Sequence, residues 1–394
     1  MSSTDLARRL LVGVTLLVVV SDSMLVPFYP RFFERALGVR SSVHIGTYVG
    51  ATCAVVMLAY PVWAWVARAR DSLRLLVSTQ LAAGVLACLA ACATSAAEFW
   101  VLSLSMIWFK GSYLLIYPYL MALPRSDDGG YLIGLLTVVV HFGTIGGAVL
   151  GGMLLEHAHP GTLLIAMGAA DALQALVCLW MLRFAPRSPT APRLRRVSAT
   201  AAVRTLALVM GAFCFSAFMT RPFFAAYWSE ISGLDDAWIA GWVYAIPGGV
   251  AVLALLWNQR RQRRGYAPHA LGPMWLVGAL GLVLQSLRLP ELLLGGRVLY
   301  GFALFQITVG LERRLFGLSS PDRYATDFAK LHVAQNAGAL GAALVAGATV
   351  DLGLELPLVL GALGLLLTGA YEINAARPDP LADPAASPAD RAVS

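Results

Sequence analysis

Charged residues are scarce in this sequence, and their scarcity excludes an ordinary soluble domain. Asp, Glu, Lys and Arg make up 13% of the 394 residues, whereas 58% are hydrophobic. Soluble domains carry roughly 25% charged residues. Apolar stretches of about 20 residues recur from Leu10 to Ala370, and each is long enough to cross a bilayer as a helix.

Paired cysteines and a removable leader are also missing. All five cysteines lie in apolar stretches with no metal ligands beside them: Cys53, Cys88, Cys92, Cys178 and Cys214. We interpret them as small hydrophobic residues. The first apolar stretch follows Arg8 and Arg9 and continues into Pro27 without a small-residue cleavage site, so we expect it to remain in the membrane.

The net charge of +7 does not indicate nucleic-acid binding, because the arginines lie in short loops between apolar stretches. Sixteen arginines fall in loops on the side of the N-terminus, against four on the other side: Arg31, Arg35, Arg40 and Arg288. Positive loops stay in the cytoplasm. We therefore expect a multi-pass protein of the cell inner membrane with both termini in the cytoplasm, which requires an even number of spans.

The apolar stretches are too long for barrel strands, so the chain is predicted to be an all-α membrane protein with twelve transmembrane helices. We place the spans near residues 7–30, 44–67, 73–94, 98–123, 130–155, 160–184, 204–228, 237–258, 268–288, 291–316, 326–350 and 354–375. Residues 1–184 and 204–376 are expected to form two six-helix bundles. The Pro- and Arg-rich segment 185–203 is the predicted cytoplasmic linker, and 377–394 a disordered tail.

An internal repeat relates the two bundles at a constant offset of 195 residues. The aligned pairs come from three separate pairs of predicted spans: Pro27 with Pro222, Phe28 with Phe223, Gly38 with Gly233, Gly46 with Gly241, Gly143 with Gly338, Gly146 with Gly341 and Gly152 with Gly347. A single offset that holds in three places predicts a duplicated bundle around a pseudo-two-fold axis. This organisation resembles the parallel repeat of major facilitator transporters, which hold substrate between the halves.

The fifth predicted span carries a glycine pattern similar to the antiporter motif of that superfamily. Its glycines are Gly134, Gly143, Gly147, Gly151 and Gly152, and Ala148 occupies the motif's proline position. The resemblance implies export rather than symport. The alternative is that these small residues only let helices pack closely. The superfamily's signature between the second and third helices is eroded here, leaving a basic cluster with Arg68, Arg70 and Arg74.

Several ionisable residues lie inside predicted spans, where each costs at least ~2.5 kcal/mol and suggests a function. They are Asp22, Lys110, His141, Arg221 and Arg297. In the family fold, helices one, four, seven and ten line the cavity, so the resemblance implies that Asp22, Lys110, Arg221 and Arg297 face it. Asp171, on the sixth span, is interpreted as an interhelical hydrogen-bonding group because that helix is peripheral in the fold.

Asp22 is the candidate proton carrier, because a low-dielectric cavity disfavours a charged carboxylate. His141 is a second coupling candidate, with core packing as its alternative. A static ion pair between Asp22 and Lys110 is the alternative for Asp22. Loss of proton-driven transport in a folded Asp22→Asn variant would separate the two interpretations.

The excess of cations predicts an anionic substrate, since a desolvated cation needs a counter-charge. The predicted substrate-binding residues are Lys110, Arg221, Arg297, Tyr29, Tyr117, Gln335 and Asn336. For Arg297 the alternative is that its side chain extends to the membrane surface.

The segment 21–33, Ser-Asp-Ser-Met-Leu-Val-Pro-Phe-Tyr-Pro-Arg-Phe-Phe, is similar to the first helix of major facilitator exporters of carboxylate siderophores. The sequence therefore predicts a proton-coupled exporter of a small anion, with such a siderophore as the implied substrate. A multidrug efflux pump and an uptake symporter are the alternatives. No nucleophile–base pair, metal cluster or phosphate loop supports an enzyme. We expect no cofactor, a monomer, and as partners a small molecule, protons and the lipid bilayer, but no nucleic acid.

Overall fold

The computed structural model describes residues 3–67, 69–116, 129–184, 200–267, 269–319 and 324–375, and these ranges contain helices and no strand. The N-terminal half comprises α1 (Ser3–Ser23), η1 (Val26–Phe28), α2 (Tyr29–Leu37), α3 (Ser42–Val66), α4 (Ser72–Ala91), α5 (Ala96–Lys110), η2 (Gly111–Leu115), α7 (Gly129–His157) and α8 (Gly161–Met181). The C-terminal half comprises α9 (Ala201–Phe218), α10 (Phe224–Ser232), α11 (Ala237–Arg263), α12 (Leu271–Ser286), α13 (Pro290–Leu318), α14 (Tyr324–Thr349), η3 (Val350–Leu352) and α15 (Leu356–Ala375).

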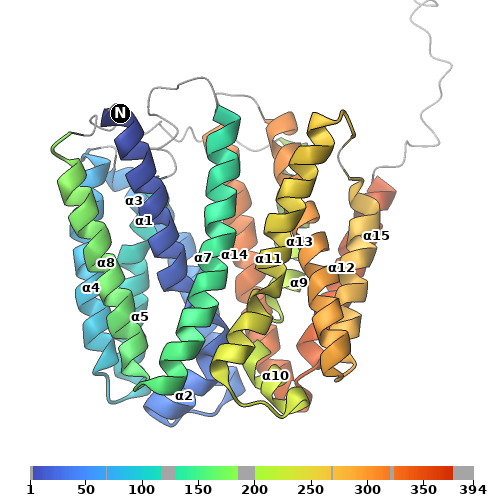
Figure 1. Ribbon diagram of the computed structural model, residues 1–394, viewed down its shortest axis with the longest axis horizontal. Coiled ribbons are helices and arrows are strands. Elements are labelled where there is room, and N and C mark those ends of the chain that lie inside the picture. Colours follow the sequence, from blue (N-terminus) through green and yellow to red (C-terminus); the bar gives the residue numbers. More distant parts are fainter. Residues whose placement is uncertain are drawn as a thin grey trace, which may run out of the picture.

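The chain is a multi-pass, all-α membrane protein. Ten helices in the described ranges are long and apolar enough to cross a bilayer, and α12 is a shorter apolar helix. The span predicted at 98–123 corresponds to α5, which has 15 residues and continues into η2. The start of α1 and the end of α15 lie at one end of the bundle (Figure 1). We call the opposite end, which carries α2 and α10, the distal end.

The first predicted span of each half is broken in the structure rather than continuous. In each half, the first helix ends four residues before a proline: α1 at Ser23 before Pro27, and α9 at Phe218 before Pro222. Proline has no N–H to donate to the carbonyl four residues earlier, and its ring clashes with that carbonyl. The chain therefore starts new, short helices at α2 and α10.

The breaks also confirm the internal repeat to the residue. Tyr29 and Phe224, which begin α2 and α10, are 195 positions apart, and so are Ser42 and Ala237, which begin α3 and α11. Both short helices end at a glycine in the left-handed region, with φ of 67° at Gly38 and 68° at Gly233. A side chain there would be strained, which explains why both halves have glycine at this place.

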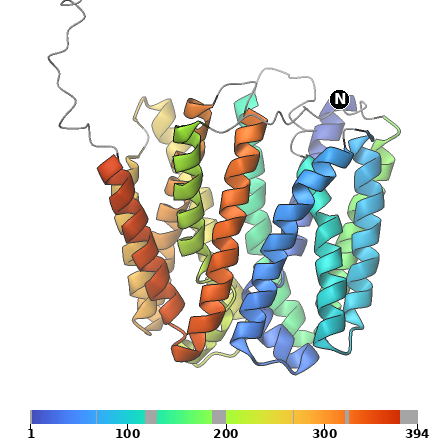
Figure 2. The ribbon, with the colours of Figure 1, turned by 180° about the vertical axis from the view of Figure 1, so that it is seen from behind.

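The two halves meet along two matching helix pairs, α7 with α11 and α3 with α14. Figure 1 shows α7 beside α11, and Figure 2 shows α3 beside α14 on the opposite face. Gly152 of α7 lies against the backbone of Ala237, and Gly347 of α14 lies against the backbone of Ser42. These contacts are equivalent under the 195-residue offset, so the pseudo-two-fold relation holds for individual backbone contacts as well as for whole helices.

Three of the motif glycines bring α7 close to α1. Gly143 packs on Val19, Gly147 on the carbonyl of Val20, and Gly151 on the carbonyl of Met24, with no space for a side-chain carbon at any of them. Gly134 lies within α7, but its surroundings fall outside the described residues. Close helix packing therefore accounts for three of these glycines, and Gly152 serves the contact between the halves.

Two predicted segments, the linker and the tail, lie largely or wholly outside the described ranges. The predicted linker 185–203 is largely outside them, and α9 begins at Ala201, three residues before the predicted start of the C-terminal bundle. The tail predicted to be disordered, 377–394, also lies outside the described residues.

Candidate functional site

A buried lysine at the end of α5 joins three helices of the N-terminal half. Lys110 Nζ lies 2.7 Å from Asp22 Oδ1 on α1 and 3.1 Å from Asp171 Oδ1 on α8. It also donates to Ser21 Oγ at 3.2 Å. A cation in the last turn of a helix is favoured by the helix dipole. We call Ser21, Asp22, Lys110, Asp171 and Gln174 the lysine cluster.

The members of the lysine cluster differ sharply in exposure. The side chain of Asp171 is 0% exposed and that of Lys110 is 5% exposed, whereas that of Asp22 is 36% exposed. Asp22 is thus the member in contact with solvent. The sequence did not decide whether Asp22 and Lys110 form an ion pair, and in the structure they do. Lys110 is paired with two acids in this conformation, and its substrate-binding role stays a prediction.

Asp171 reaches the cluster because α4 and α8 approach closely. Gly84 of α4 and Gly168 of α8 lie against each other's backbone, and Gly84 also faces the β-carbon of Asp171. The sequence predicted that Asp171 makes an interhelical hydrogen bond, and its contact with Lys110 on α5 is one; the sequence did not predict that the same lysine also holds Asp22. The spacing of Asp171 and Gln174, three residues apart on one helix face, is the signal that could have indicated a polar site. Gln174 Nε2 donates to Asp171 Oδ1 at 3.3 Å.

Arg297 of α13 is buried within the C-terminal half and does not extend to the membrane surface. It is 2% exposed and lies over the rings of Phe224 and Tyr244, with its Cζ atom 4.2 and 5.4 Å from the ring centroids. Its Nε donates to the carbonyl of Val243 at 3.2 Å, and its guanidinium also donates to the carbonyl of Tyr244.

Those hydrogen bonds have a local cause in α11. Pro247 lies inside this helix, four residues after Val243, and it cannot donate to the Val243 carbonyl. Arg297 supplies the missing donor. Gly301, one turn further along α13, lets the helix approach Pro247. The arginine predicted to bind substrate is therefore occupied by the backbone of its own half.

Arg221 is the cation that faces the other half. It lies between α9 and α10, is half-buried, and stacks on Phe218 with Cζ 3.7 Å from the ring centroid. It interacts electrostatically with Cys53 on α3 and His141 on α7. Within the described ranges, no acid lies within ion-pair distance of Arg221.

The remaining predicted site residues make separate contacts of their own. Tyr29 packs edge-on against Tyr48, with centroids 5.6 Å apart. The ring of His141 lies 5.9 Å from that of Phe305 on α13, across the halves. Asn336 donates to the carbonyl of His332 in its own helix at 2.9 Å. Two residues complete the set: Gln335, which is half-buried on α14, and Tyr117, which lies outside the described residues.

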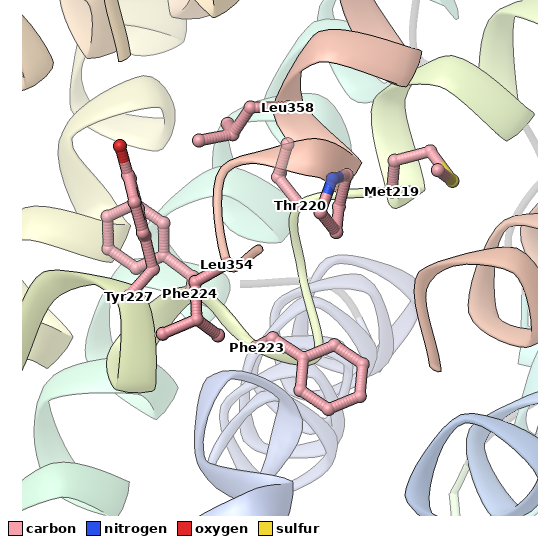
Figure 3. Close-up of a pocket in the computed structure, with 8 residues that line it drawn as sticks. Met219, Thr220, Phe223, Phe224, Tyr227, Leu354 and Leu358 are labelled. Carbon is pink, nitrogen blue, oxygen red and sulfur yellow. The ribbon is translucent and has the colours of Figure 1, made fainter. Parts of the chain in front are cut away.

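A small pocket lies at the break between α9 and α10. Figure 3 shows Phe223, Phe224 and Tyr227 from this break and α10, together with Leu354 and Leu358 from the start of α15. Its volume is ≈ 10 Å³, about the space of one water molecule. This pocket is too small to hold a metabolite.

Polar contacts between the halves gather at the distal end. Arg31 donates to the carbonyl of Asp235 at 2.5 Å, beside a groove of ≈ 580 Å³ between α2 and α10. Two further contacts each place an acid of one half at the helix start of the other. Ser42 Oγ donates to Asp351 at 2.6 Å, and the Trp238 N–H donates to Glu156 at 3.2 Å.

These last two contacts, which we call the distal latch, are related by the repeat. Glu156 and Asp351 are 195 residues apart, and each accepts from the first turn of α11 or α3. A carboxylate at a helix N-terminus is stabilised by the unpaired N–H groups and the helix dipole. The latch therefore holds the two halves together at one end of the bundle.

Comparisons with known proteins agree on the fold. No protein-family model matches the sequence, and no curated protein matches it. A bacterial homologue of the human lysosomal transporter Spinster, inward-facing and occupied, is similar in structure with a TM-score of 0.77 and 14% identity over 95% of this chain and 98% of that chain. The nucleoside transporter NupG gives a TM-score of 0.70 and 12% identity, covering 94% and 99%. The human organic anion transporter MFSD10 gives 0.67 and 17%, covering 92% and 99%.

The duplicated helical halves and this likeness over nearly the whole chain define the class: an integral membrane protein with the fold of major facilitator transporters. The predicted fold class is confirmed. Within that fold, this chain has the lysine cluster in one half and Arg221 in the other.

Proposed function

We propose that this protein is a proton-coupled secondary active transporter that exports a small anionic molecule by alternating access. The implied substrate class is a carboxylate siderophore. The observation that carries the proposal is the division of charge between the halves. One half holds an acid-rich ionisable cluster that reaches solvent through Asp22, and the other presents Arg221, which has no acid partner among the described residues.

The lysine cluster supplies a reason for proton coupling. Asp22 is paired with Lys110 and also partly exposed, so a proton from solvent can compete with the ammonium group for its carboxylate. A change in the protonation of the lysine cluster would change the pairing of Lys110 and thereby how firmly α1 is held to α5. A proton can thus change how the cavity helices of this half are held together, which is what a coupled transporter requires.

Arg221 supplies a reason for anion recognition. A guanidinium binds carboxylates with two parallel hydrogen bonds, and Arg221 has no acid within ion-pair distance among the described residues. The printed name of MFSD10, an organic anion transporter, is in keeping with this choice. A lipophilic-cation pump, the multidrug alternative, would be disfavoured by an uncompensated arginine.

The proposed direction of transport, export rather than uptake, rests on the antiporter-like glycine pattern. The proposed substrate, a carboxylate siderophore, rests on the resemblance of the first helix. Because three of these glycines also have a packing role against α1, direction must be measured. The predicted monomer, inner-membrane location and cytoplasmic termini belong to the same proposal.

Transport in vesicles tests the proposal. Inside-out membrane vesicles from cells expressing the wild-type protein would be energised and given a radiolabelled citrate-based siderophore. We expect accumulation that collapses when a protonophore is added, and little accumulation with Asp22→Asn at equal protein level. A second variant, Arg221→Ala, removes the candidate anion-binding charge. Its matched control is Arg288→Ala, which removes an arginine from an exposed loop. Accumulation that is insensitive to the protonophore, or is unchanged in Asp22→Asn, would contradict proton coupling through Asp22.

A parallel measurement does not presuppose the substrate. Metabolite profiling of culture medium from a deletion strain should show an anionic compound missing from the medium and retained in the cells. Retention of a neutral or cationic compound instead would overturn the anion assignment.

A further inference from the structure

Two buried acceptor atoms in the lysine cluster have no hydrogen-bond donor in the part of the chain that the structure describes. They are Asp171 Oδ2 and Gln174 Oε1, and their side chains belong to residues that are 0% and 1% exposed. Buried polar atoms are nearly always paired, so an unpaired one calls for an explanation. Two unpaired acceptors on adjacent side chains indicate that a donor is missing between helices that exclude water.

The charges of the cluster are unbalanced as well. Lys110 contributes one positive charge, whereas Asp22 and Asp171 would contribute two negative charges if both were ionised. The charged groups acting on Asp171 are Lys110 on α5 and Asp22 on α1, while α4 faces it with Gly84. A net negative charge buried in the membrane is unfavourable. One proton would remove the imbalance.

We infer that Asp171 holds this proton on Oδ2 in the conformation described here, and that its release transfers Lys110 from Asp22 to Asp171. The inference rests on the proposed proton-coupled transport. It names Asp171, rather than Asp22, as the residue that stores the proton. A protonated Oδ2 is a donor, so the unpaired acceptor becomes a group able to pair with the Gln174 amide oxygen.

Exposure decides which acid holds the proton. Water stabilises the ionised Asp22, whose side chain is 36% exposed, whereas no water reaches Asp171 at 0%. Burial penalises the ionised form of a carboxyl more than its neutral form. In the protonated state, Asp22 is therefore the counter-ion of Lys110.

The proton-release step is balanced without any further reactant. When a conformational change admits water to the cluster, the O–H bond of Asp171 breaks, the proton passes to that water, and the electron pair of the bond stays on Oδ2. The new carboxylate then neutralises Lys110. Asp22 is freed from its ion pair and turns toward the solvent it already reaches, so α1 is no longer held to α5 by charge.

Infrared spectroscopy of the purified protein in phosphatidylcholine vesicles tests the inference at neutral pH. Protonated carboxyls give a C=O stretching band separate from that of carboxylates. The difference spectrum between wild type and Asp171→Asn should contain one such band. A difference spectrum without it would overturn the inference.

Substitutions of two uncharged members of the lysine cluster, Gln174 and Ser21, test which acid holds the proton. Gln174→Leu should shift the band, because Gln174 touches Asp171, whereas Ser21→Ala should leave it in place, because Ser21 touches Lys110 beside Asp22. A band that moves with Ser21→Ala and not with Gln174→Leu would place the proton on Asp22. These two variants keep both acids, so they decide the question even if Asp171→Asn does not fold.

The infrared measurement needs no substrate. A failure of the proposed transport function can therefore be distinguished from a failure of the inference about Asp171. Absence of energised transport in the wild type would contradict the proposed function and leave the infrared result standing. Proton-coupled transport that persists in Asp171→Asn would contradict the role of Asp171 and leave the proposed function standing.

Discussion

At the level of single residues, the ionisable groups lie where the repeat is broken. Asp22 corresponds to Ala217, and Lys110 corresponds to Phe305 at the same offset of 195. Arg221 and Arg297 likewise correspond to the apolar residues Val26 and Leu102. The duplication therefore explains the helical frame, and the charged site is an asymmetric addition to it.

Arg221→Ala should weaken substrate binding without lowering the amount of folded protein. A hydrogen bond to a charged group contributes about 1.5–3 kcal/mol, so we expect KM to rise about 10- to 100-fold. Initial transport rates against substrate concentration measure this change. Arg221→Lys should recover part of the affinity because it keeps the charge and loses the two-pronged geometry. Equal losses of expression and activity would instead give Arg221 a structural role.

Gly151→Ala should destabilise the protein because its new β-carbon would meet the Met24 carbonyl. Overpacking a close contact costs about 1–3 kcal/mol. Gly13→Ala on α1 is the matched control, since nothing lies within 4 Å of a β-carbon there, and alanine favours a helix by about 0.5–1 kcal/mol. Thermal unfolding in detergent should show a lower midpoint for Gly151→Ala than for Gly13→Ala. Equal midpoints would exclude the close approach of α7 and α1.

At the level of helices, the sequence located the spans and indicated one of their two interruptions. The predicted spans 7–30 and 204–228 are split before α2 and α10. Hydropathy continues across the breaks, so a hydropathy criterion cannot find them. Pro222, followed by Phe223 and Phe224, indicates a broken helix beside Arg221, whereas the break at Pro27 was not predicted.

Helix α11 offers a test of the role assigned to Arg297. Arg297→Ala should destabilise the fold by about 1–3 kcal/mol, because the Val243 carbonyl is left buried without a donor. Pro247→Ala restores that donor, so Arg297→Ala should cost about 1 kcal/mol less in a Pro247→Ala background. Denaturant unfolding of the four proteins of this double-mutant cycle gives the coupling. Additive effects would show that Arg297 does not compensate for Pro247.

At the level of the whole molecule, the distal latch should hold one conformation of an alternating-access cycle. Removing charge with Glu156→Gln and Asp351→Asn weakens two carboxylate contacts to helix N-termini, each worth about 0.3–1 kcal/mol. We expect the population that is open at the distal end to rise about 3- to 30-fold.

Spin labels at Val43 and Leu352, both exposed beside the latch, would report this change as a longer inter-label distance in a cysteine-free background. Glu98→Gln is the control, because Glu98 accepts a hydrogen bond from Thr94 within its own half. A distance distribution that the double variant leaves unchanged would remove the latch from the conformational equilibrium.

The sequence by itself determined that this chain is a duplicated, helical membrane protein. That conclusion follows from local properties, because the cost of unpaired backbone groups in lipid makes each apolar stretch a helix, and the constant offset shows the duplication directly. The sequence also identified Asp22, Lys110, Arg221 and Arg297 as ionisable residues within the membrane.

Only the tertiary structure decided which of those charges meet. Asp171 reaches Lys110 because Gly84 and Gly168 let α4 and α8 approach closely. Arg297 is taken up by carbonyls near Pro247, and Arg221 is left facing the other half. These outcomes depend on which helices are neighbours and how closely they pack. Lateral packing in a membrane is set by small residues distant in sequence, so no local pattern around a charged residue reveals its partner.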